Sequence, residues 1–238
     1  MIFTEKYCVG LGDLDQNGKI TNKAILKMFE DTAGFHSDSV NNGVARIDIN
    51  GTAWVIMSWK LKVLNRPEYG ARLTVETWSR SMNRASAFRD FRLINEKGEL
   101  CAIASSQWAI IDIKERKIVR IDTSMNELYY SDPTAVFEEW KPDRTPIPEE
   151  FERTLEGFVR RCDTDIIGHM HNLNYLDMAL EMLPEEVYAK GECSDMTVAY
   201  KNEVKVGETI KCGYYREEDK HCAAIFGGKG IAAIIKMW

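Results

Sequence analysis

The sequence lacks the features that define several protein classes. No apolar run approaches the length of a membrane-spanning helix, so an integral membrane protein is not expected. Six cysteines are scattered without a Cys-x-x-Cys pair, which disfavours a disulfide framework and a structural zinc site. The chain carries 31 basic against 37 acidic residues, and this net charge of −6 gives no general attraction to nucleic acid or to an anionic membrane.

The first residues have neither the apolar core of a signal peptide nor the Arg and Ser bias of a transit peptide. Together with the unpaired cysteines, this predicts a cytoplasmic protein with reduced thiols. The remaining composition is ordinary, with 238 residues of which 45% are hydrophobic and 29% charged. Such a chain can form one large domain or two small ones.

Histidine is also scarce, but two of the four histidines fall in one short stretch, residues 163–172, with the sequence DTDIIGHMHN. Gly168 precedes the first histidine, and Asn172 is placed to cap a helix that ends before Pro184. Leucines follow at helical spacing on one face: Leu173, Leu176, Leu180 and Leu183. We therefore expect acid–base side chains beside the positive end of a buried helix.

The chain contains an internal repeat at an offset of 150 residues. Six identities occur in sixteen aligned positions without a gap, and they pair Asp13 with Asp163, Asp15 with Asp165, Gly18 with Gly168, Asn22 with Asn172, Leu26 with Leu176, and Met28 with Met178. Repeats of this kind indicate that one structural unit occurs twice.

Each copy predicts a central helix followed by a meander of antiparallel strands, an α+β pattern in which the helix covers one face of a sheet. The first helix is expected to end at Gly34. Strands are expected at residues 7–9, 54–63, 72–78, 87–94 and 100–111, and in the second copy at 196–204, 208–215 and 231–238. Residues 114–155 are charged and hold most of the prolines, among them Pro142, and indicate an exposed linker with a short helix near 124–130.

The second copy differs from the first in its titratable side chains. His169 replaces Lys19, and His171 replaces Thr21. Glu203 is expected in a strand at the position that Lys62 occupies in the first copy. Two interpretations stay open from the residues alone: acid–base chemistry, or solvated loop histidines with an outward-facing strand glutamate.

The start of the first copy, Asp13-x-Asp15-x-Asn17-Gly18, has the beginning of a calcium loop. The twelfth position of such a loop should be a bidentate glutamate, but it is Ala24. A turn that leads into a helix explains these residues better, because short Asp and Asn side chains bond back to the backbone. We therefore expect no metal site.

The chain resembles the acyl-[acyl-carrier-protein] thioesterases, the double-hotdog enzymes of plastids and bacteria, over almost its full length. The first half carries Tyr7-Cys8-Val9-Gly10, Glu30-Asp31-Thr32-Ala33, Trp54-Val55, Val63, Pro67, Thr77-Trp78, Arg89-Asp90 and Ala104-Ser105-Ser106-Gln107-Trp108. The second half carries Asp163-x-Asp165, His169, Asn172, Tyr175, Glu181 and Tyr200-Lys201-x-Glu203. The resemblance implies a tandem double hotdog, with two antiparallel sheets each wrapped around a central helix.

The same resemblance implies which residues are catalytic. The family pattern is Asp-x-Asn-x-His at the helix start with a Glu further on, which assigns Asp165, His169 and Glu203. Ile167 stands at the Asn position and departs from the pattern. A cysteine that an older proposal made the nucleophile is replaced by Val204, so an acyl-cysteine route is not expected. No cofactor is implied.

The implied function is hydrolysis of fatty acyl-[acyl-carrier-protein] in fatty acid biosynthesis. The implied domains are an acyl-tail-binding hotdog at 1–113, the linker at 114–155 and a catalytic hotdog at 156–238. An acyl-CoA thioesterase, or a binding protein that lost hydrolysis because of Ile167, are alternatives. The sequence does not reveal the acyl chain length.

The partner implied is the acidic acyl carrier protein, with no nucleic acid or membrane partner. Its docking surface is expected at one of two basic clusters: Arg80, Arg84, Arg89 and Arg92, or Lys114, Arg116, Lys117 and Arg120. Solvated strand edges are the simpler explanation for either cluster. A homodimer is possible, although two hotdog units in one chain can replace it.

Overall fold

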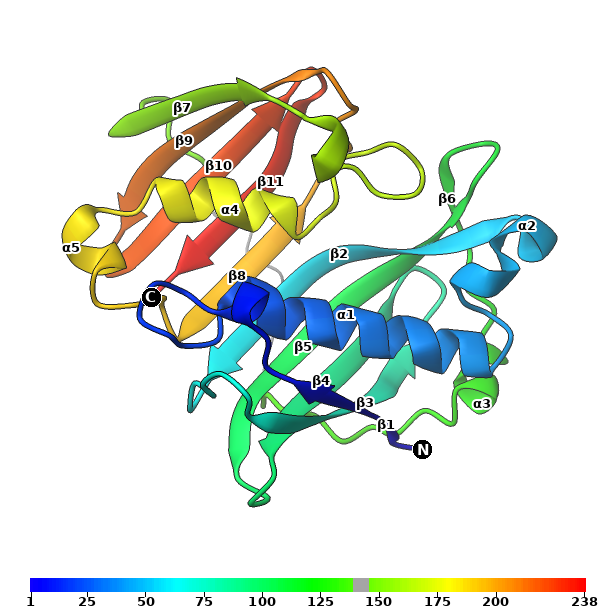
Figure 1. The fold of residues 1–238 in the computed structure, drawn as a ribbon. Coiled ribbons are helices and arrows are strands. Elements are labelled where there is room, and N and C mark those ends of the chain that lie inside the picture. The colour runs from blue at the N-terminus through cyan, green and yellow to red at the C-terminus, as the bar shows by residue number, and fades with distance from the viewer. Residues whose placement is uncertain (139–145) are drawn as a thin grey trace. The chain divides into compact units, whose positions relative to one another are not determined.

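The computed structural model describes residues 1–138 and 146–238 and divides the chain into two compact units, Met1–Trp140 and Lys141–Trp238 (Figure 1). Pro142 and the neighbouring residues of the predicted linker lie outside the described residues. No helix within the described ranges is long and apolar enough to cross a membrane. Each unit combines one main helix with antiparallel strands, which confirms the predicted α+β class.

The first unit is built around one long helix. Its helices are α1 (Asn22–Ser39), α2 (Ile47–Asn50) and α3 (Met125–Leu128). Its strands are β1 (Phe3–Cys8), β2 (Thr52–Val63), β3 (Arg72–Met82), β4 (Ala87–Asn95), β5 (Leu100–Asp112) and β6 (Lys117–Val119). The strands pair in the order β1-β3-β4-β5-β2, and β6 adds to β5.

Helix α1 packs on one face of this sheet because its apolar side chains recur at helical spacing. Ile25 and Phe29 are fully buried, and the Phe29 ring stacks on Phe91 of β4 with centroids 5.0 Å apart. Thr21 caps the helix by accepting the N–H of Ala24 at 3.0 Å. The predicted end at Gly34 was wrong: the helix continues to Ser39. Buried His36 and Ser37 hold its last turns, and this packing outweighs the modest helix penalty of one glycine.

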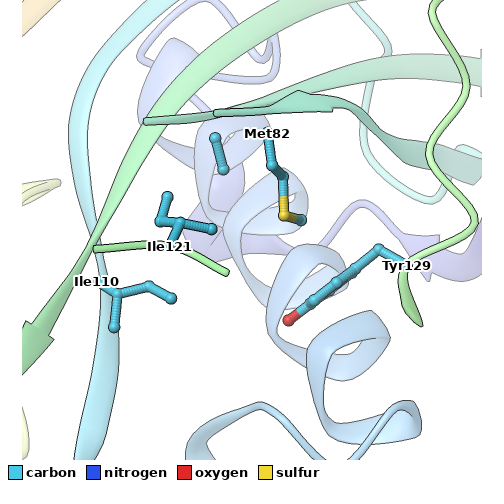
Figure 2. Packing of buried hydrophobic residues seen from close by; sticks show 5 residues of the cluster. Met82, Ile110, Ile121 and Tyr129 are labelled. Atoms are coloured by element: carbon cyan, nitrogen blue, oxygen red, sulfur yellow. The ribbon is translucent and has the colours of Figure 1, made fainter. Parts of the chain in front are cut away.

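The chain after β5 packs onto the first unit. Ile121 and Tyr129 are buried in a cluster with Met82, Ala87 and Ile110 (Figure 2). Helix α3 confirms the short helix expected near 124–130. Two large apolar side chains of the predicted linker are therefore buried in a core, while most residues of 117–130 are exposed or partly exposed. The domain boundaries themselves stay a prediction.

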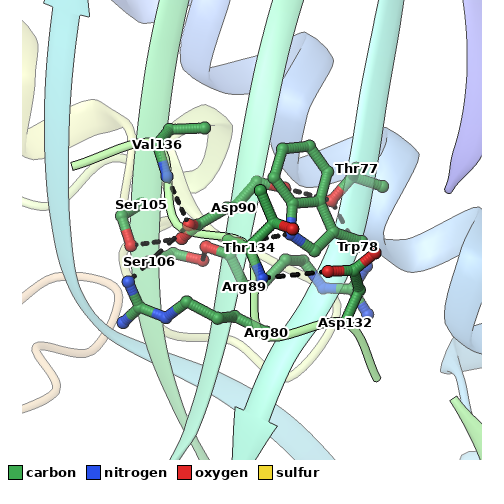
Figure 3. A network of polar contacts seen from close by, with 10 residues as sticks. All are labelled: Thr77, Trp78, Arg80, Arg89, Asp90, Ser105, Ser106, Asp132, Thr134 and Val136. Atoms are coloured by element: carbon green, nitrogen blue, oxygen red, sulfur yellow. Dashed lines mark hydrogen bonds and ion pairs between the residues drawn. The ribbon is translucent and has the colours of Figure 1, made fainter. Parts of the chain in front are cut away.

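The segment 131–138 covers part of the sheet through a polar network (Figure 3). The indole of Trp78 donates to the Thr134 carbonyl at 2.8 Å. The Asp90 carboxylate accepts the Ser105 hydroxyl at 2.6 Å and the Val136 N–H at 3.0 Å. Burial raises the pKa of Asp90, and these hydrogen bonds work against that rise.

Arg89 is buried, which corrects one of the two predicted docking surfaces. Its guanidinium donates to Nδ1 of His36 at 2.9 Å and to the Thr77 hydroxyl at 3.3 Å, and it lies over the Tyr129 ring. Adjacent strand residues point to opposite faces, so Arg89 turns toward α1 while Asp90 turns toward segment 131–138. Arg89 cannot contribute to a basic surface.

The second unit repeats this plan with a shorter helix. Its helices are α4 (Asn174–Glu181) and α5 (Glu185–Tyr188). Its strands are β7 (Arg153–Phe158), β8 (Asp195–Tyr200), β9 (Thr209–Glu217), β10 (Lys220–Gly227) and β11 (Gly230–Met237). Within this unit they pair in the order β8-β11-β10-β9-β7. In reverse, this order is β7-β9-β10-β11-β8, and it matches the order β1-β3-β4-β5-β2 of the first unit. The two units therefore share one strand order, in agreement with the sequence repeat.

Candidate active site

The stretch 163–171 forms a tight turn that leads into α4. Asp163 closes its first corner: the carboxylate accepts the backbone N–H of Arg160 at 2.9 Å and binds the Arg160 guanidinium at 2.7 and 2.9 Å. The hydrogen bond from the Arg160 side chain holds the pKa of Asp163 below its usual value. Gly168 takes a φ of +81°, a conformation that glycine adopts without a steric penalty.

Asp165 holds the backbone on which His169 is mounted. One oxygen of its carboxylate accepts the N–H of Ile167 at 2.9 Å and the N–H of His169 at 3.1 Å. Its own N–H donates to the His169 carbonyl at 2.8 Å. The sequence placed Asp165 and His169 together, and the structure does so through the backbone. The Asp165 carboxylate is therefore directed at main-chain N–H groups, and it positions the backbone of His169.

His169 and Glu203 form the side-chain pair of the site. Nε2 of His169 lies 3.3 Å from Oε2 of Glu203. The His169 side chain is 9% exposed and the Glu203 side chain 32%, so the pair lies at the surface with the imidazole on its buried side. A carboxylate beside an imidazole can fix the orientation of the ring by accepting its N–H. The arrangement can therefore accept and return a proton.

Glu203 reaches His169 from a loop, which corrects the sequence-based prediction of a strand. Strand β8 ends at Tyr200, and residues 201–208 connect it to β9. The Val204 carbonyl accepts the N–H of Met170 at 2.8 Å, and His169 forms an isolated β-bridge with Lys205. The two residues that follow Glu203 therefore attach this loop to the turn through backbone contacts.

The first unit contains the same turn with different side chains. Asp15 again accepts two backbone N–H groups, from Asn17 and from Lys19, both at 2.9 Å. Lys19 stands where His169 stands in the second unit, and its ammonium pairs with the carboxylate of Glu68. The backbone frame is thus common to both units, whereas the histidine–glutamate pair belongs to the second.

The structure also revises the counterpart of Glu203. Pro67 in the first unit and Val204 in the second each accept a backbone N–H from the turn, at 3.0 and 2.8 Å. The residue before Pro67 is Arg66, so Arg66 corresponds to Glu203, and Lys62 does not. The strand alignment missed this because β2 is longer than β8.

Helix α4 begins one turn after His169, at Asn174. The predicted cap residue, Asn172, accepts the N–H of Leu173 at 2.8 Å, and its own carbonyl accepts the Tyr200 hydroxyl at 3.0 Å. Asn172 therefore shapes the approach to the helix, which starts without a side-chain cap. The Leu173 N–H also lies 3.3 Å from Nδ1 of His171, a contact that turns this histidine toward the backbone.

Two residues near the pair were not identified as functional from the sequence. Burial raises the pKa of Tyr175 to about 12, and the negative charges of Asp165, Glu208 and Glu203 add to the rise, so its hydroxyl keeps its proton. The ammonium of Lys229 lies 2.9 Å from Oε1 of Glu203. A lysine in a glycine-rich turn gives no signal in the sequence that it will reach a carboxylate twenty-six residues earlier.

Potential metal-ligating side chains do not cluster in the part of the chain that the structure describes. Among residues 1–138 and 146–238, no group of three or more His, Cys, Asp or Glu side chains is placed to hold a metal ion. In the turn that begins like a calcium loop, Asp15 is engaged with backbone N–H groups. Fold and site together define an α+β protein with a histidine–carboxylate pair suited to moving a proton at the start of a helix.

Comparison with known protein families assigns the chain to one family. The model of the acyl-ACP thioesterase N-terminal domain matches residues 1–129, and the model of the acyl-ACP thioesterase C-terminal domain matches residues 147–229. The chain belongs to the acyl-ACP thioesterase family. The turn, the loop of Glu203 and Lys229 all lie in the part that matches the C-terminal domain.

Curated relatives include plant enzymes of low identity. Oleoyl-acyl carrier protein thioesterase 1 of Arabidopsis thaliana is 23% identical over 230 residues, which cover 87% of this chain and 62% of that protein. Palmitoyl-acyl carrier protein thioesterase of Cuphea hookeriana is 23% identical over 218 residues, which cover 85% of this chain and 52% of that protein. The chain thus spans between half and two thirds of the length of these two relatives.

Solved structures share the fold over the whole chain. An acyl-ACP thioesterase from Bacteroides thetaiotaomicron superposes with a TM-score of 0.87 at 23% identity, covering 99% of this chain and 96% of the other. The 12:0-ACP thioesterase from Umbellularia californica superposes with a TM-score of 0.84 at 15% identity, with the same coverage. At these identities the likeness establishes the fold.

Proposed function

We propose that this protein hydrolyses fatty acyl thioesters carried on acyl carrier protein and releases a free fatty acid. Family membership supports the reaction class. The observation that carries the proposal is the distance of 3.3 Å between Nε2 of His169 and Oε2 of Glu203 at the start of α4. Relatives that match both parts of the chain are named for the same reaction. The cytoplasm is the proposed location, and fatty acid biosynthesis the proposed pathway.

In the proposed mechanism, the His169–Glu203 pair activates a water molecule as general base. The water oxygen attacks the thioester carbonyl carbon, and the pair takes the proton that the water loses. When the C–S bond breaks, the same proton can pass to the departing thiolate. Asp165 keeps His169 in place through the backbone. N–H groups near the start of α4 would stabilise the charge on the carbonyl oxygen.

We also propose the tandem double hotdog and the division into an acyl-tail-binding half at 1–113, a linker at 114–155 and a catalytic half at 156–238. The shared strand order of the two units supports the duplicated architecture. The placement of a histidine–glutamate pair in the second unit, against a lysine–glutamate pair in the first, supports the assignment of chemistry to the second half. A homodimer remains a proposal that sedimentation would test.

Removing either member of the pair should abolish turnover. His169→Ala and Glu203→Gln are each expected to lower kcat by at least about a hundredfold, the usual contribution of a positioned general base. Hydrolysis of acyl-[acyl-carrier-protein] followed by thiol release measures this effect, with acyl-CoA assayed in parallel to decide the donor.

Glu68→Gln is the matched control, because Glu68 pairs with Lys19 on the equivalent turn of the first unit. It should leave kcat near the wild-type value. If His169→Ala retains wild-type hydrolysis, the proposed mechanism is wrong.

One observation favours a second function. The position where the family pattern has Asn is occupied by Ile167, a residue that is 40% exposed and whose side chain offers no hydrogen bond. A protein that binds acyl chains without cleaving them would need no donor there. Wild-type thioester hydrolysis at a rate of several turnovers per minute excludes this alternative, and binding of acyl-[acyl-carrier-protein] without product release supports it.

A further inference from the structure

The carboxylate of Glu203 is shared between two cationic or potentially cationic groups. Oε2 faces Nε2 of His169 at 3.3 Å, and Oε1 faces Nζ of Lys229 at 2.9 Å. Lys229 lies in the two-residue turn between β10 and β11, on an element separate from the loop of Glu203 and from the turn of His169. Three separate segments of the second unit therefore meet at one carboxylate.

The β10–β11 turn is fixed against the Glu203 loop at more than one point. Lys201 and Asn202 donate their backbone N–H groups to the Ala232 carbonyl at 2.8 and 3.4 Å. The Asn202 side chain donates to the Ile231 carbonyl at 2.7 Å. These bonds join the loop to the first residues of β11, immediately after the turn that carries Lys229.

Glycine makes the closest part of this contact possible. A Cβ atom on Gly227 would lie 2.6 Å from Cγ2 of Val204, the residue after Glu203. Gly230 has a φ of +94°, which closes the turn behind Lys229. Lys229 therefore follows, two residues later, a glycine at which an added side-chain carbon would clash with the loop.

The charged and titratable groups around Glu203 come from every element that meets it. His169 and Lys229 contact its carboxylate, and Tyr175 of α4 is close enough for the Glu203 charge to raise its pKa. Asp165 and Glu208 act on Tyr175 in the same direction. Within the loop, Lys201 and Lys205 flank Glu203 in sequence, and the Lys205 N–H bonds to the Glu208 carboxylate at 3.0 Å.

We propose that Lys229 is a positioning residue that sets the pH range of the His169–Glu203 pair. Its ammonium holds Oε1, so that Oε2 remains directed at the imidazole. Its positive charge also favours the ionised carboxylate and the neutral imidazole, the forms in which the pair can accept a proton. This inference rests on the proposed function, and it adds a residue that the family pattern of catalytic side chains does not contain.

An ion pair at the surface can also be of little consequence. The Lys229 side chain is 57% exposed, and exposed pairs of this kind contribute little to stability. Stability is therefore the wrong measurement. A positioning role is distinguished by its effect on the protonation of His169, which contacts the other oxygen of the Glu203 carboxylate.

The decisive experiment compares pH profiles of kcat for the wild type and three variants. In Lys229→Met, a positive charge is lost and both Glu203 and His169 should become more basic. The fall of kcat on the acidic side of the profile should therefore move to higher pH by about half a unit. Lys229→Arg keeps the charge and should retain the wild-type profile. Lys211→Met is the matched control, because Lys211 pairs with Glu156 at 3.5 Å on the surface of the same unit.

Salt provides an independent check. The difference between wild type and Lys229→Met should shrink at about 1 M salt, where exposed charges are screened over about 3 Å. The proposal is overturned if the Lys229→Met profile superimposes on the wild-type profile. It is also overturned if Lys211→Met shifts the acidic side of the profile equally.

A second readout does not depend on turnover. The pKa of His169, followed by NMR titration of its ring protons and assigned with His169→Ala, should rise in Lys229→Met and not in Lys211→Met. An unchanged His169 pKa overturns the role of Lys229 even if the protein hydrolyses nothing. Conversely, loss of activity in His169→Ala with an unmoved profile in Lys229→Met leaves the proposed function intact and removes this inference alone.

Discussion

At the scale of single residues, position 167 shows how a turn can keep its shape while its chemistry changes. The N–H of Ile167 donates to Asp165 at 2.9 Å, and the N–H of Asn17 donates to Asp15 at the same distance in the first unit. The turn uses only the backbone of this residue. An asparagine at 167 should therefore fold as asparagine does at 17.

Ile167→Asn is expected to raise kcat toward that of an enzyme with the complete family pattern. One oriented hydrogen-bond donor in an oxyanion site is worth about 3–4 kcal/mol, so a gain of about a hundredfold or more is expected if the side chain reaches the reacting carbonyl. Thioester hydrolysis by purified wild type and variant measures it, with Ile166→Asn as the control. Equal rates for all three proteins would mean that another group already fills this role.

Residue assignments made from the sequence differ in how well physical reasoning could support them. The proximity of His169 and Glu203 follows from the family pattern, since no spacing rule links residues so far apart in the chain. Asp165 was expected beside the imidazole, whereas its carboxylate binds backbone N–H groups. Arg89 was expected at the surface, because composition alone does not show which face of a strand a side chain takes.

At the scale of secondary-structure elements, the contact between Gly227 and Val204 connects the β10–β11 turn to the site. A methyl group on Gly227 would come within 2.6 Å of Cγ2 of Val204 and would displace the loop of Glu203. Gly227→Ala should lower kcat by about ten- to a hundredfold, because small displacements of catalytic groups are costly. Steady-state hydrolysis measures the effect.

Two further variants make this prediction specific. Gly228→Ala should be neutral, because nothing lies within 4 Å of its added Cβ. Val204→Ala should restore activity in the Gly227→Ala background by removing the clashing methyl groups, a coupling that a double-mutant cycle quantifies. Additive losses in the double variant would refute the steric explanation.

Elements with strong patterns were predictable, and elements without them were not. Strand β2 is rich in Val, Ile and Trp, and this β-prone composition located it within two residues at its start. Strand β7 was missed because all six of its residues are exposed, so its sequence has no alternation of apolar and polar residues that would indicate a strand. The helix end at Gly34 was wrong because the packing of later residues decides where α1 ends.

At the scale of the whole molecule, the buried His36–Arg89 pair couples stability to pH. Burial first, and then the charge of Arg89, lower the pKa of His36 to about 3 from the ordinary value of 6.5. Burial also lowers the pKa of Arg89 to about 10, so the guanidinium remains charged at neutral pH. The folded protein therefore holds a neutral imidazole beside a cation.

Stability from this pair is fully present above pH 6.5 and is lost as the pH falls toward 3, because the unfolded chain then binds a proton that the folded chain excludes. At about pH 4.5 the loss should be about 2–3 kcal/mol, at about 1.4 kcal/mol per pKa unit. Urea unfolding across this range measures it. His36→Gln cannot titrate and should show a flatter profile, and equal slopes for both proteins would contradict the assignment.

The backbone frame shared by the two turns has a consequence for how such proteins diversify. A carboxylate at the first position of the loop, a glycine in the left-handed conformation and a few main-chain bonds hold residue 19 and residue 169 in the same geometry. The side chain at that point is lysine in one unit and histidine in the other, while the backbone bonds of the turn are the same. After a gene fuses with its own copy, one half can lose or change its reactive groups while the other keeps them, and ancestral reconstruction of the two halves would reveal in which order those exchanges occurred.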